Sequence, residues 1–354
     1  MSINKLVLKS KIKDYDIFFV DSCDFLKKYD DNCVFVVDEN VWEHHSKGCL
    51  SDLDAGDVII LPIGEEKKGL ESVLKLYDKM MERSAKRNMT IVSIGGGITQ
   101  DITGFMASTL YRGINWVYVP TTLLAQADSC IGSKTSLNYK QYKNLIGTFY
   151  PPTEIYIYSP FLTTQQDIDF FSGVGEVVKL HLMGGEENVN KIIAELAMIA
   201  DKESDALLRA VQNSLLIKQS YIEEDEFDTG RRNLLNYGHC FGHAIESATD
   251  FSIPHGQAVV LGMILANKVA KNRNLLSPDS EAFIAEKLLW PVAQIKETLD
   301  FDVDRVIEAM KQDKKRTGTE LALIMMVNGY EMIKVNDLSE NEAAEVLSGE
   351  KILN

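Results

Sequence analysis

The chain has 354 residues, of which 45% are hydrophobic and 25% are charged, so it is long enough for two domains with hydrophobic cores. Its formal net charge of -15 repels phosphate backbones, which argues against nucleic acid as a partner. The five cysteines form no CxxC motif, and no apolar run reaches the roughly 18 residues of a membrane span. We therefore expect a cytoplasmic protein with free thiols and neither a targeting nor a membrane segment.

The N-terminal part alternates β-branched runs with polar helical stretches. The strand-like runs are "DIFFV" (16–20), "CVFVVDEN" (33–40), "DVIILPIGEE" (57–66), "TIVSIGGG" (90–97) and "INWVYVPTT" (114–122). An amphipathic helical stretch, "LESVLKLYDKMMERSAKR", separates the third run from the fourth. Strands of the buried type that alternate with helices predict an α/β domain with a Rossmann-like parallel sheet, which we place at residues 1–160.

From about Gly173 the pattern changes to long helical segments, such as 190–222 and 256–273, with few strand-like runs. This pattern predicts a second, mainly α-helical domain over residues 161–354. The stretch "FYPPTEIYIYSPFLTT" (149–164) is the predicted crossing between the domains, because its prolines interrupt regular elements.

Three consecutive glycines, Gly95, Gly96 and Gly97, end a predicted strand and precede a predicted helix. Glycines there let a pyrophosphate approach the backbone, and the helix N-terminus offers N–H donors. The pattern is not GxGxxG, so a tight turn without a nucleotide is the alternative. Asp101 suits a nucleotide site but also any helix N-terminus. Lys68, in "LPIGEEKKG", is either a second phosphate contact or an ordinary surface charge.

A cluster of histidines indicates a metal site. His239 and His243 lie four residues apart on one helical face, and His255 stands at the start of another predicted helix. A catalytic zinc takes three ligands of the histidine and carboxylate type, so two of these histidines and one acid would suffice. Cys240 stands where an HExxH metallopeptidase has its glutamate, which argues against that class. Histidines satisfied within a core are the alternative.

The candidate carboxylate ligand is Glu176, a lone acid among apolar residues in "GVGEVVKLHL". Lys179 follows three residues later on the same helix face. A semi-exposed ion pair between the two side chains, without any metal, is the alternative interpretation.

A set of cations occurs singly beside apolar, glycine or asparagine neighbours rather than in charged runs. Isolated cations of this kind indicate inward-facing contacts to a phosphate or carboxylate, although each alone is also explained as surface charge. The set comprises Arg112, Lys134, Lys143, Lys218, Arg232, Lys314 and Lys315.

These motifs together resemble the 3-dehydroquinate synthase family of sugar-phosphate cyclases. The resemblance runs in order from residue 38 to about residue 320 and includes "GGGITQDITGF", "RGINWVYVPTTLLAQADSCIGSKTSLN", "KNLIGTFYPP", "GEVVK", "RRNLLNYGHCFGHAIE", "PHGQAV" and "DKK". It implies conversion of 3-deoxy-D-arabino-heptulosonate 7-phosphate to 3-dehydroquinate and phosphate. It also implies NAD in the N-terminal domain, zinc in the C-terminal domain with cobalt as a substitute, and a homodimer.

The resemblance assigns the zinc ligands to Glu176, His239 and His255, and makes His243 a substrate partner. Arg112 is expected to reach the substrate phosphate, across a dimer interface. The other expected substrate residues are Lys134, Asn144, Lys179, Lys218, Arg232, Asn236 and Lys314. The expected NAD residues are Asp38, Asn40, Glu65, Lys68, Gly97, Asp101, Thr121, Thr122, Asp128, Lys134, Lys143 and Thr164.

The chain departs from the family pattern at a few positions. Ser133 and Ser136 stand in "GSKTSLN" where the family has glycines, and Thr99 and Gln100 replace a small residue and a glycine. These serines leave open a related cyclase of secondary metabolism, which would act on sedoheptulose 7-phosphate. A metal-dependent NAD polyol dehydrogenase and a catalytically silent paralogue are further alternatives. The residues Asn236, His243, Lys218 and Lys314 keep the dehydroquinate synthase pattern.

Overall fold

The computed structural model describes residues 4–29, 32–140, 142–294, 302–312 and 321–348, and its chain forms two compact units. The first unit comprises Met1–Gln165 together with Ile222–Phe227, and the second comprises Gln166–Tyr221 with Asp228–Asn354. The chain thus first leaves the first unit after Gln165, whereas the sequence analysis placed the boundary at 160/161. Phe161 packs in the core of the first unit, which accounts for the later crossing.

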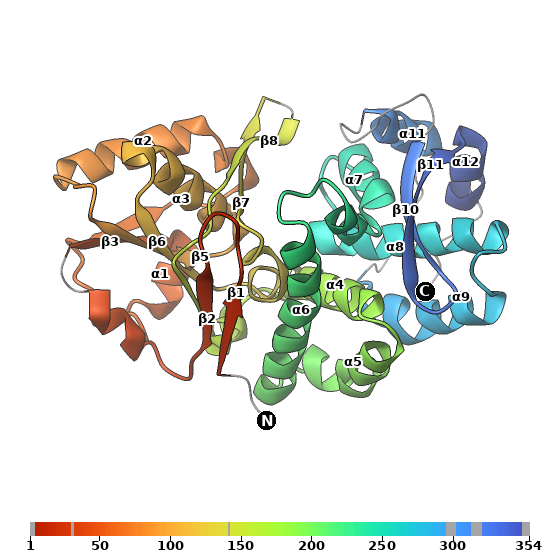
Figure 1. Ribbon diagram of the computed structural model, residues 1–354, viewed down its shortest axis with the longest axis horizontal. Coiled ribbons are helices and arrows are strands. Elements are labelled where there is room, and N and C mark those ends of the chain that lie inside the picture. The colour runs from red at the N-terminus through yellow and green to blue at the C-terminus, as the bar shows by residue number, and fades with distance from the viewer. Residues whose placement is uncertain (1–3, 30–31, 141, 295–301, 313–320, 349–354) are drawn as a thin grey trace. The chain divides into compact units, whose positions relative to one another are not determined.

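The first unit is built on a seven-stranded sheet with the order β1-β2-β9-β6-β5-β3-β4 (Figure 1). All neighbouring strands are parallel except β1 and β2, which form an antiparallel edge pair. The predicted Rossmann-like parallel sheet is therefore confirmed. The strands are β1 (Lys5–Leu8), β2 (Tyr15–Phe19), β3 (Cys33–Asp38), β4 (Val58–Leu61), β5 (Thr90–Gly95), β6 (Asn115–Pro120) and β9 (Glu154–Ile157).

Helices cover both faces of this sheet. Helix α1 (Glu39–His45) lies on one face, and α2 (Leu70–Glu82) and α3 (Gly97–Thr109) lie on the other (Figure 1). All six residues of β3 are buried for this reason, and its run of valines suits a strand without a solvent face. A separate antiparallel hairpin, β7 (Lys134–Tyr139) and β8 (Tyr142–Phe149), completes the unit.

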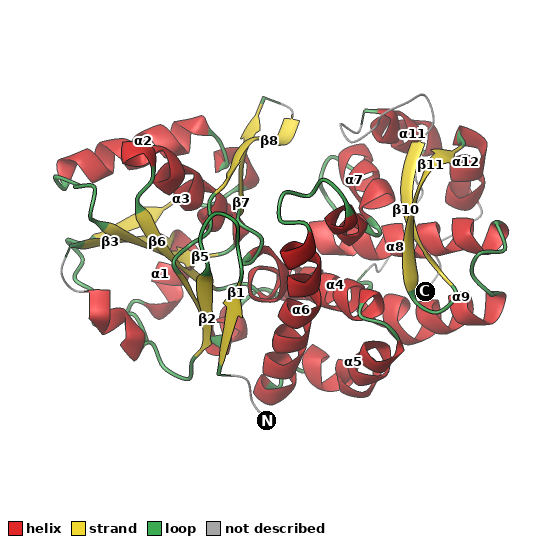
Figure 2. Cartoon of the chain, in the orientation of Figure 1, coloured by secondary structure: helices red, strands yellow, loops and turns green. Residues whose placement is uncertain are grey.

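The second unit is mainly helical, as predicted (Figure 2). It also contains an antiparallel hairpin of β10 (Leu321–Val327) and β11 (Glu331–Leu338), which the sequence analysis did not predict. Within the described residues, no helix has the length and hydropathy of a membrane span. The main helices are α4 (Asp167–Met183), α5 (Glu186–Ala200), α6 (Ser204–Glu224), α7 (His239–Ala248), α8 (His255–Asn272), α9 (Pro278–Ile284), α11 (Val303–Lys311) and α12 (Glu340–Ser348).

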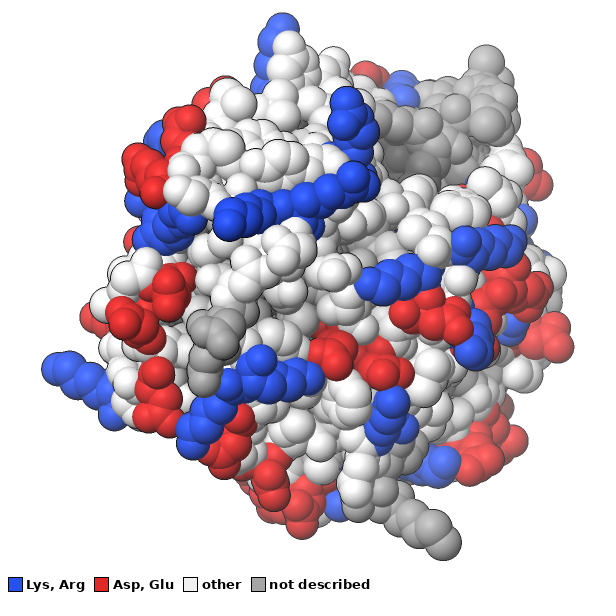
Figure 3. All heavy atoms as spheres, turned by 60° about the vertical axis from the view of Figure 1, so that its left-hand side comes forward, with Lys and Arg blue, Asp and Glu red and all other residues white. Residues whose placement is uncertain are grey.

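Charged side chains of both signs share the surface. On the face drawn in Figure 3, lysines and arginines lie in short rows beside aspartates and glutamates. On this face the net charge of -15 is therefore not expressed as a field of one sign.

Glycines let the central helix α8 pack unusually close to α4 and α7. A Cβ atom on Gly256 would lie 1.9 Å from the carbonyl oxygen of Ser172 in α4. A Cβ atom on Gly262 would likewise lie 1.9 Å from the carbonyl oxygen of Gly238, the residue before α7. Both obstacles are backbone atoms, which cannot rotate away as a side chain can. Only glycine therefore fits at these two positions of α8.

We predict that Gly262→Ala destabilises the protein by about 2 kcal/mol or more, because the added methyl group must push α8 away from the start of α7. Denaturant unfolding followed by circular dichroism measures the change. Gly48→Ala is the control, since its Cβ would meet its nearest atom, the carbonyl oxygen of His45, at an ordinary 3.6 Å. Equal midpoints for the two variants would contradict the close approach of the helices.

Candidate active site

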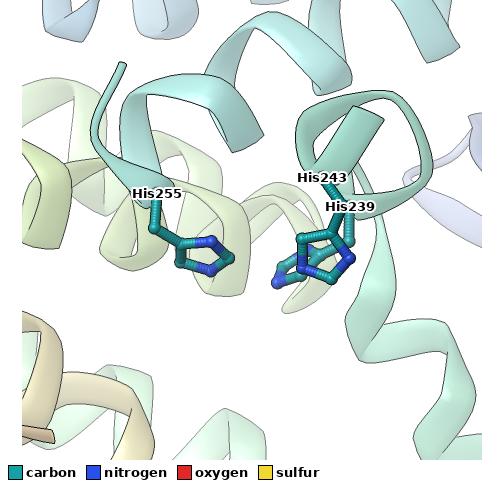
Figure 4. Close-up of side chains that lie close together, drawn as sticks. All are labelled: His239, His243 and His255. Atoms are coloured by element: carbon teal, nitrogen blue, oxygen red, sulfur yellow. The ribbon is translucent and has the colours of Figure 1, made fainter. Parts of the chain in front are cut away.

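Three histidines converge in the second unit (Figure 4). His239 and His243 are one turn apart on α7, and His255 is the first residue of α8. One nitrogen from each ring lies within 4.8 Å of the others. Gly238 allows this placement because its φ of +79° lies in the left-handed region and turns the chain into α7.

Glu176 on α4 faces two of these histidines. Its Oε1 atom lies 3.7 Å from Nε2 of His239 and 3.5 Å from Nε2 of His255. The Glu176 side chain is only 1% exposed, which contradicts the semi-exposed ion pair considered above. The Lys179 ammonium pairs with Oε2 at 2.5 Å, whereas the nearest donors to Oε1 are the two imidazole nitrogens at 3.5 Å and beyond. A divalent cation would bind a buried carboxylate oxygen in this position more closely than the imidazoles do.

Hydrogen bonds at the far side of each ring orient the two imidazoles. The Nδ1 atom of His239 lies 3.1 Å from the carbonyl oxygen of Tyr237, which can only accept, so Nδ1 carries the hydrogen. The Nδ1 atom of His255 lies 3.0 Å from the carboxylate of Glu246, where it also donates. Both Nε2 atoms are then directed toward Glu176. The sequence analysis did not identify Glu246, although it ends the motif "GHAIE".

The charge states of Glu176 and His239 agree with a cation site, whereas His255 holds a proton that a cation would displace. Burial alone would raise the pKa of Glu176, but the charge of Lys179 and the hydrogen bond with His255 hold it well below its ordinary value. Burial and the charge of Lys179 lower the pKa of His239, so its ring is neutral, as a metal ligand must be. Burial opposes protonation of His255, but its bonds to Glu176 and Glu246 outweigh burial and raise its pKa to about 10.

The remaining predicted substrate residues of the second unit are also polar groups held at or near the interior. Lys218 on α6 and Arg232 in the turn Arg231–Asn236 are buried, which is unusual for cations and contrasts with ordinary surface charge. Asn236 donates a hydrogen bond from Nδ2 to the carbonyl oxygen of Asn233 at 2.8 Å. His243 is exposed, and Lys314 lies outside the described residues.

In the first unit, the glycine-rich turn forms a helix N-terminus that no side chain caps. Gly95 ends β5, Gly96 is the N-cap residue, and α3 begins at Gly97. Gly96 has no side chain that could accept a hydrogen bond from the first turn of α3. The backbone N–H groups of this turn can therefore be presented to an anion. The nearest atom to a Cβ on Gly97 would be Oγ of Ser129 at 3.8 Å, which leaves this corner open.

A polar network lies beside this turn. Lys68 is buried, and its Nζ atom lies 2.5 Å from Oδ2 of Asp101 and 2.7 Å from Oδ1 of Asn144. Ser136 joins the same network, since its backbone N–H donates to Asp101 at 2.8 Å and its hydroxyl donates to Asn144 at 2.9 Å. Burial raises the pKa of Asp101 despite the opposing charge of Lys68. Lys68 is thus not a surface charge.

The amide orientation of Asn144 follows from this network. A lysine ammonium only donates, so the atom that faces Lys68 must be the amide oxygen. The backbone N–H of Asn144 donates to Oδ1 of Asn138 at 2.9 Å, which fixes the main chain as well. The amide NH2 of Asn144 is therefore the end that can donate to a ligand.

The two serines that replace family glycines differ in their surroundings. Ser133 has a φ of +64°, the left-handed region that favours glycine, and its buried hydroxyl has no hydrogen-bond partner in the described structure. Ser136 instead contributes its hydroxyl to the network with Asn144. The sequence shows both substitutions, but it does not predict the backbone conformation of Ser133 or the hydrogen bond of the Ser136 hydroxyl.

The other predicted NAD residues lie around the carboxyl ends of the strands in the first unit. Asp38 ends β3 and caps α1, where it accepts a hydrogen bond from the backbone of Asn40 at 2.9 Å. Glu65 accepts from Asn138 at 2.8 Å and lies 4.0 Å from Lys143. Thr121 is buried directly after β6, Thr122 follows it, and Asp128 lies in the helical turn Ala125–Ser129. The hydroxyl of Thr164 lies 2.9 Å from Nε2 of His45. Lys134 and Arg112 are exposed.

Fold and site therefore define a protein with one unit suited to a nucleotide and a second suited to a metal ion.

Two family profiles match the chain: "3-dehydroquinate synthase N-terminal" at residues 58–172 and "3-dehydroquinate synthase C-terminal" at residues 173–316. A 3-dehydroquinate synthase of Streptococcus equi subsp. equi (strain 4047) is 33% identical over 337 residues, which cover 92% of each chain. The chain belongs to the 3-dehydroquinate synthase family.

Two further similarities agree with this assignment. A 3-dehydroquinate synthase of Clostridium tetani (strain Massachusetts / E88) is 45% identical over 209 residues, which cover 59% of this chain and 56% of that protein. The crystal structure of a 2-deoxy-scyllo-inosose synthase, complexed with carbaglucose-6-phosphate, NAD+ and Co2+, has a TM-score of 0.80 and 25% identity. That match covers 97% of this chain and 99% of the other.

We predict that His239→Ala and Glu176→Gln each weaken Co2+ binding by more than about a hundredfold, because each removes one of the donors that converge at the site. Titration of the metal-free protein with Co2+, followed by its visible absorption, measures the affinity without any assay of activity. His44→Ala, an exposed histidine on α1, is the control and should bind Co2+ like the unchanged protein.

His243→Ala distinguishes the two sets of ligands that the geometry offers. With Glu176, His239 and His255 as ligands, this variant keeps Co2+ affinity within about threefold of the parent. Loss of Co2+ binding in His243→Ala, together with its retention in Glu176→Gln, would replace that set by the three histidines.

Proposed function

We propose that this protein is an NAD- and zinc-dependent 3-dehydroquinate synthase, which converts 3-deoxy-D-arabino-heptulosonate 7-phosphate to 3-dehydroquinate and phosphate. The observation that carries the proposal is the buried Glu176 carboxylate, with two oriented imidazoles directed at it, in a chain whose two halves both match this family. We further propose that it acts as a homodimer in the cytoplasm.

The proposed metal ligands are Glu176, His239 and His255, with Glu246 orienting His255 and Lys179 keeping Glu176 ionised. A set of one carboxylate and two imidazoles is typical of a catalytic zinc site that keeps a position open, and a bound metal would displace the proton that His255 holds without it. When bound, NAD accepts and returns a hydride, and the metal acts as a Lewis acid toward the substrate hydroxyl. The N–H groups at the start of α3, together with Lys68 and Asp101, would hold the NAD.

The remaining residues would bind and orient the substrate. Lys134, Arg112 and the amide NH2 of Asn144 would hold the phosphate in place while it leaves and accepts the neighbouring proton, so that the protein contributes by positioning. Lys179, Lys218, Arg232 and Lys314 would fix the substrate carboxylate and hydroxyls, with Asn236 and His243 as further polar partners. Buried cations of this kind offset the repulsion of an anionic substrate by a chain of net charge -15.

A second candidate is a cyclase of secondary metabolism that takes another sugar phosphate. Ser133 and Ser136 favour it, because they replace family glycines directly before and within the hairpin that carries Lys134 and Asn144. The structural likeness to a 2-deoxy-scyllo-inosose synthase also supports this alternative. The retained Lys218, Asn236 and His243 favour the dehydroquinate synthase instead.

The assignment is tested by incubating the protein with NAD, Zn2+ and 3-deoxy-D-arabino-heptulosonate 7-phosphate. We expect phosphate and 3-dehydroquinate in equal amounts with no net NADH, because the hydride returns to the ring in each turnover. Net NADH without phosphate would indicate a dehydrogenase. Turnover of sedoheptulose 7-phosphate alone would indicate the second candidate.

Ser136→Gly is predicted to raise the KM for the sugar phosphate about fivefold, since one hydrogen bond that orients the Asn144 amide is worth about 1 kcal/mol. Steady-state kinetics at saturating NAD measures the change. Ser133→Gly is the matched control, and we expect no change in KM because the Ser133 hydroxyl has no partner in the described structure. An equal effect of both substitutions would contradict a role for the Ser136 hydroxyl.

A further inference from the structure

A cavity in the first unit contains two thiols that the proposed reaction does not use. Its volume is about 250 Å³, and its lining includes both Cys23 and Cys49, together with Tyr158. Cys23 precedes the turn Asp24–Tyr29, and Cys49 follows the end of α1. Both side chains are partly exposed and pack against the hydrophobic core of the unit. Two of the other three cysteines, Cys33 and Cys130, are buried.

The two thiols line one cavity, and an imidazole lies beside them. Cys23 and Cys49 both belong to the lining, each affects the pKa of the other, and Sγ of Cys49 lies 3.9 Å from Nδ1 of His45. A disulfide forms where the side chains of two such thiols can meet. The arrangement is therefore a pair of thiols with a base, rather than a lone cysteine.

The two thiols differ in acidity. The interaction with Cys23, followed by the neighbouring His45, outweighs burial and lowers the pKa of Cys49 to about 5. The interaction with Cys49, together with burial, raises the pKa of Cys23 far above its ordinary value. At neutral pH, Cys49 is then the thiolate nucleophile and Cys23 keeps its proton, which is the division of roles found in reactive cysteine pairs.

The charged residues that line the cavity favour a neutral oxidant over an anionic one. Asp21, Asp24 and Asp52 line it against a single cation, Lys27, which lies 2.7 Å from Asp24 and 3.4 Å from Asp52. This net negative lining repels anionic disulfides such as oxidised glutathione. A small neutral hydroperoxide meets no such barrier.

We propose that Cys23 and Cys49 form a second reactive site, a dithiol that is oxidised by hydrogen peroxide to a disulfide. The Cys49 thiolate attacks one peroxide oxygen, the O–O bond breaks, and the departing hydroxide takes the proton of Cys23, which gives a sulfenic acid and water. The Cys23 sulfur then attacks the sulfenic sulfur, the S–O bond breaks, and hydroxide leaves and is protonated to water. Two thiols lose two electrons in all, and one peroxide is reduced to two waters.

The test is oxidation of the folded full-length chain by hydrogen peroxide, followed by alkylation of the remaining thiols and peptide mapping without reduction. We expect loss of two of the five thiols and a peptide pair linked through Cys23 and Cys49. Oxidised glutathione at the same concentration should react at least about tenfold more slowly. A disulfide between other cysteines, or faster reaction with oxidised glutathione, would overturn the proposal.

Single variants separate the two roles. Cys23→Ser should stop at a sulfenic acid on Cys49, which dimedone traps, because the resolving thiol is missing. Cys49→Ser should slow peroxide-dependent thiol loss by at least about tenfold, because it removes the thiolate. Cys130→Ser is the control and should form the disulfide at the parent rate, since Cys130 is buried elsewhere in the unit. Equal peroxide reactivity of Cys23→Ser and Cys49→Ser would contradict the assigned roles.

Discussion

The candidate metal site depends on the close approach of three helix backbones. Each donor comes from a different part of the second unit, with Glu176 on α4, His239 on α7 and His255 on α8. Gly256 brings α8 against α4, and Gly262 brings α8 against the start of α7. The donor atoms can meet only because these contacts have no side chain between them. The precision of the site is therefore a property of helix packing, since the donors themselves lie on helices and not on long loops.

Burial of charge is the second constraint on the molecule. The chain is acidic overall, yet it places Lys68, Lys179, Lys218 and Arg232 in its interior. A buried cation is tolerated only with a partner, and Lys68 and Lys179 each lie 2.5 Å from a carboxylate. Lys179 keeps Glu176 ionised where a cation is expected, whereas burial outweighs the effect of Lys68 on the pKa of Asp101. The interior thus supplies local positive charge to the candidate sites of a chain whose net charge is -15.

Much of the fold was predictable because it rests on local patterns. The β-branched runs and the amphipathic stretch predicted a parallel sheet with helices between its strands, and the histidine spacing agrees with α7 and the start of α8. The hairpin of β10 and β11 was missed, since a few apolar residues there do not distinguish a strand from a helix. The burial of Glu176 could not be read from its neighbours, because it arises from packing between distant segments.

The same limit applies to the residues around the sites. Glu246 acts on His255 through the way two helices meet, whereas Asn138 acts on Glu65 and His45 on Thr164 through contacts that join distant parts of the chain. Sequence spacing carries no signal for such contacts. The replacement of glycine by Ser133 and Ser136 was visible, but their unequal roles became clear only from the left-handed backbone of one and the hydroxyl contact of the other.

The chain leaves the first unit, returns to it for one short segment and leaves again, which has a consequence for biosynthesis. The segment Ile222–Phe227 belongs to the first unit, where Glu226 accepts hydrogen bonds from the hydroxyl of Ser10 and from the backbone of Lys11 at 2.5 and 2.6 Å. A ribosome makes Ser10 early but Glu226 only after α4, α5 and the whole of α6. These hydrogen bonds of the first unit can therefore form only after the segment Gln166–Tyr221 of the second unit has been synthesised. The segment between β1 and β2 therefore gains its hydrogen bonds to Glu226 late in translation, although it belongs to the N-terminal unit.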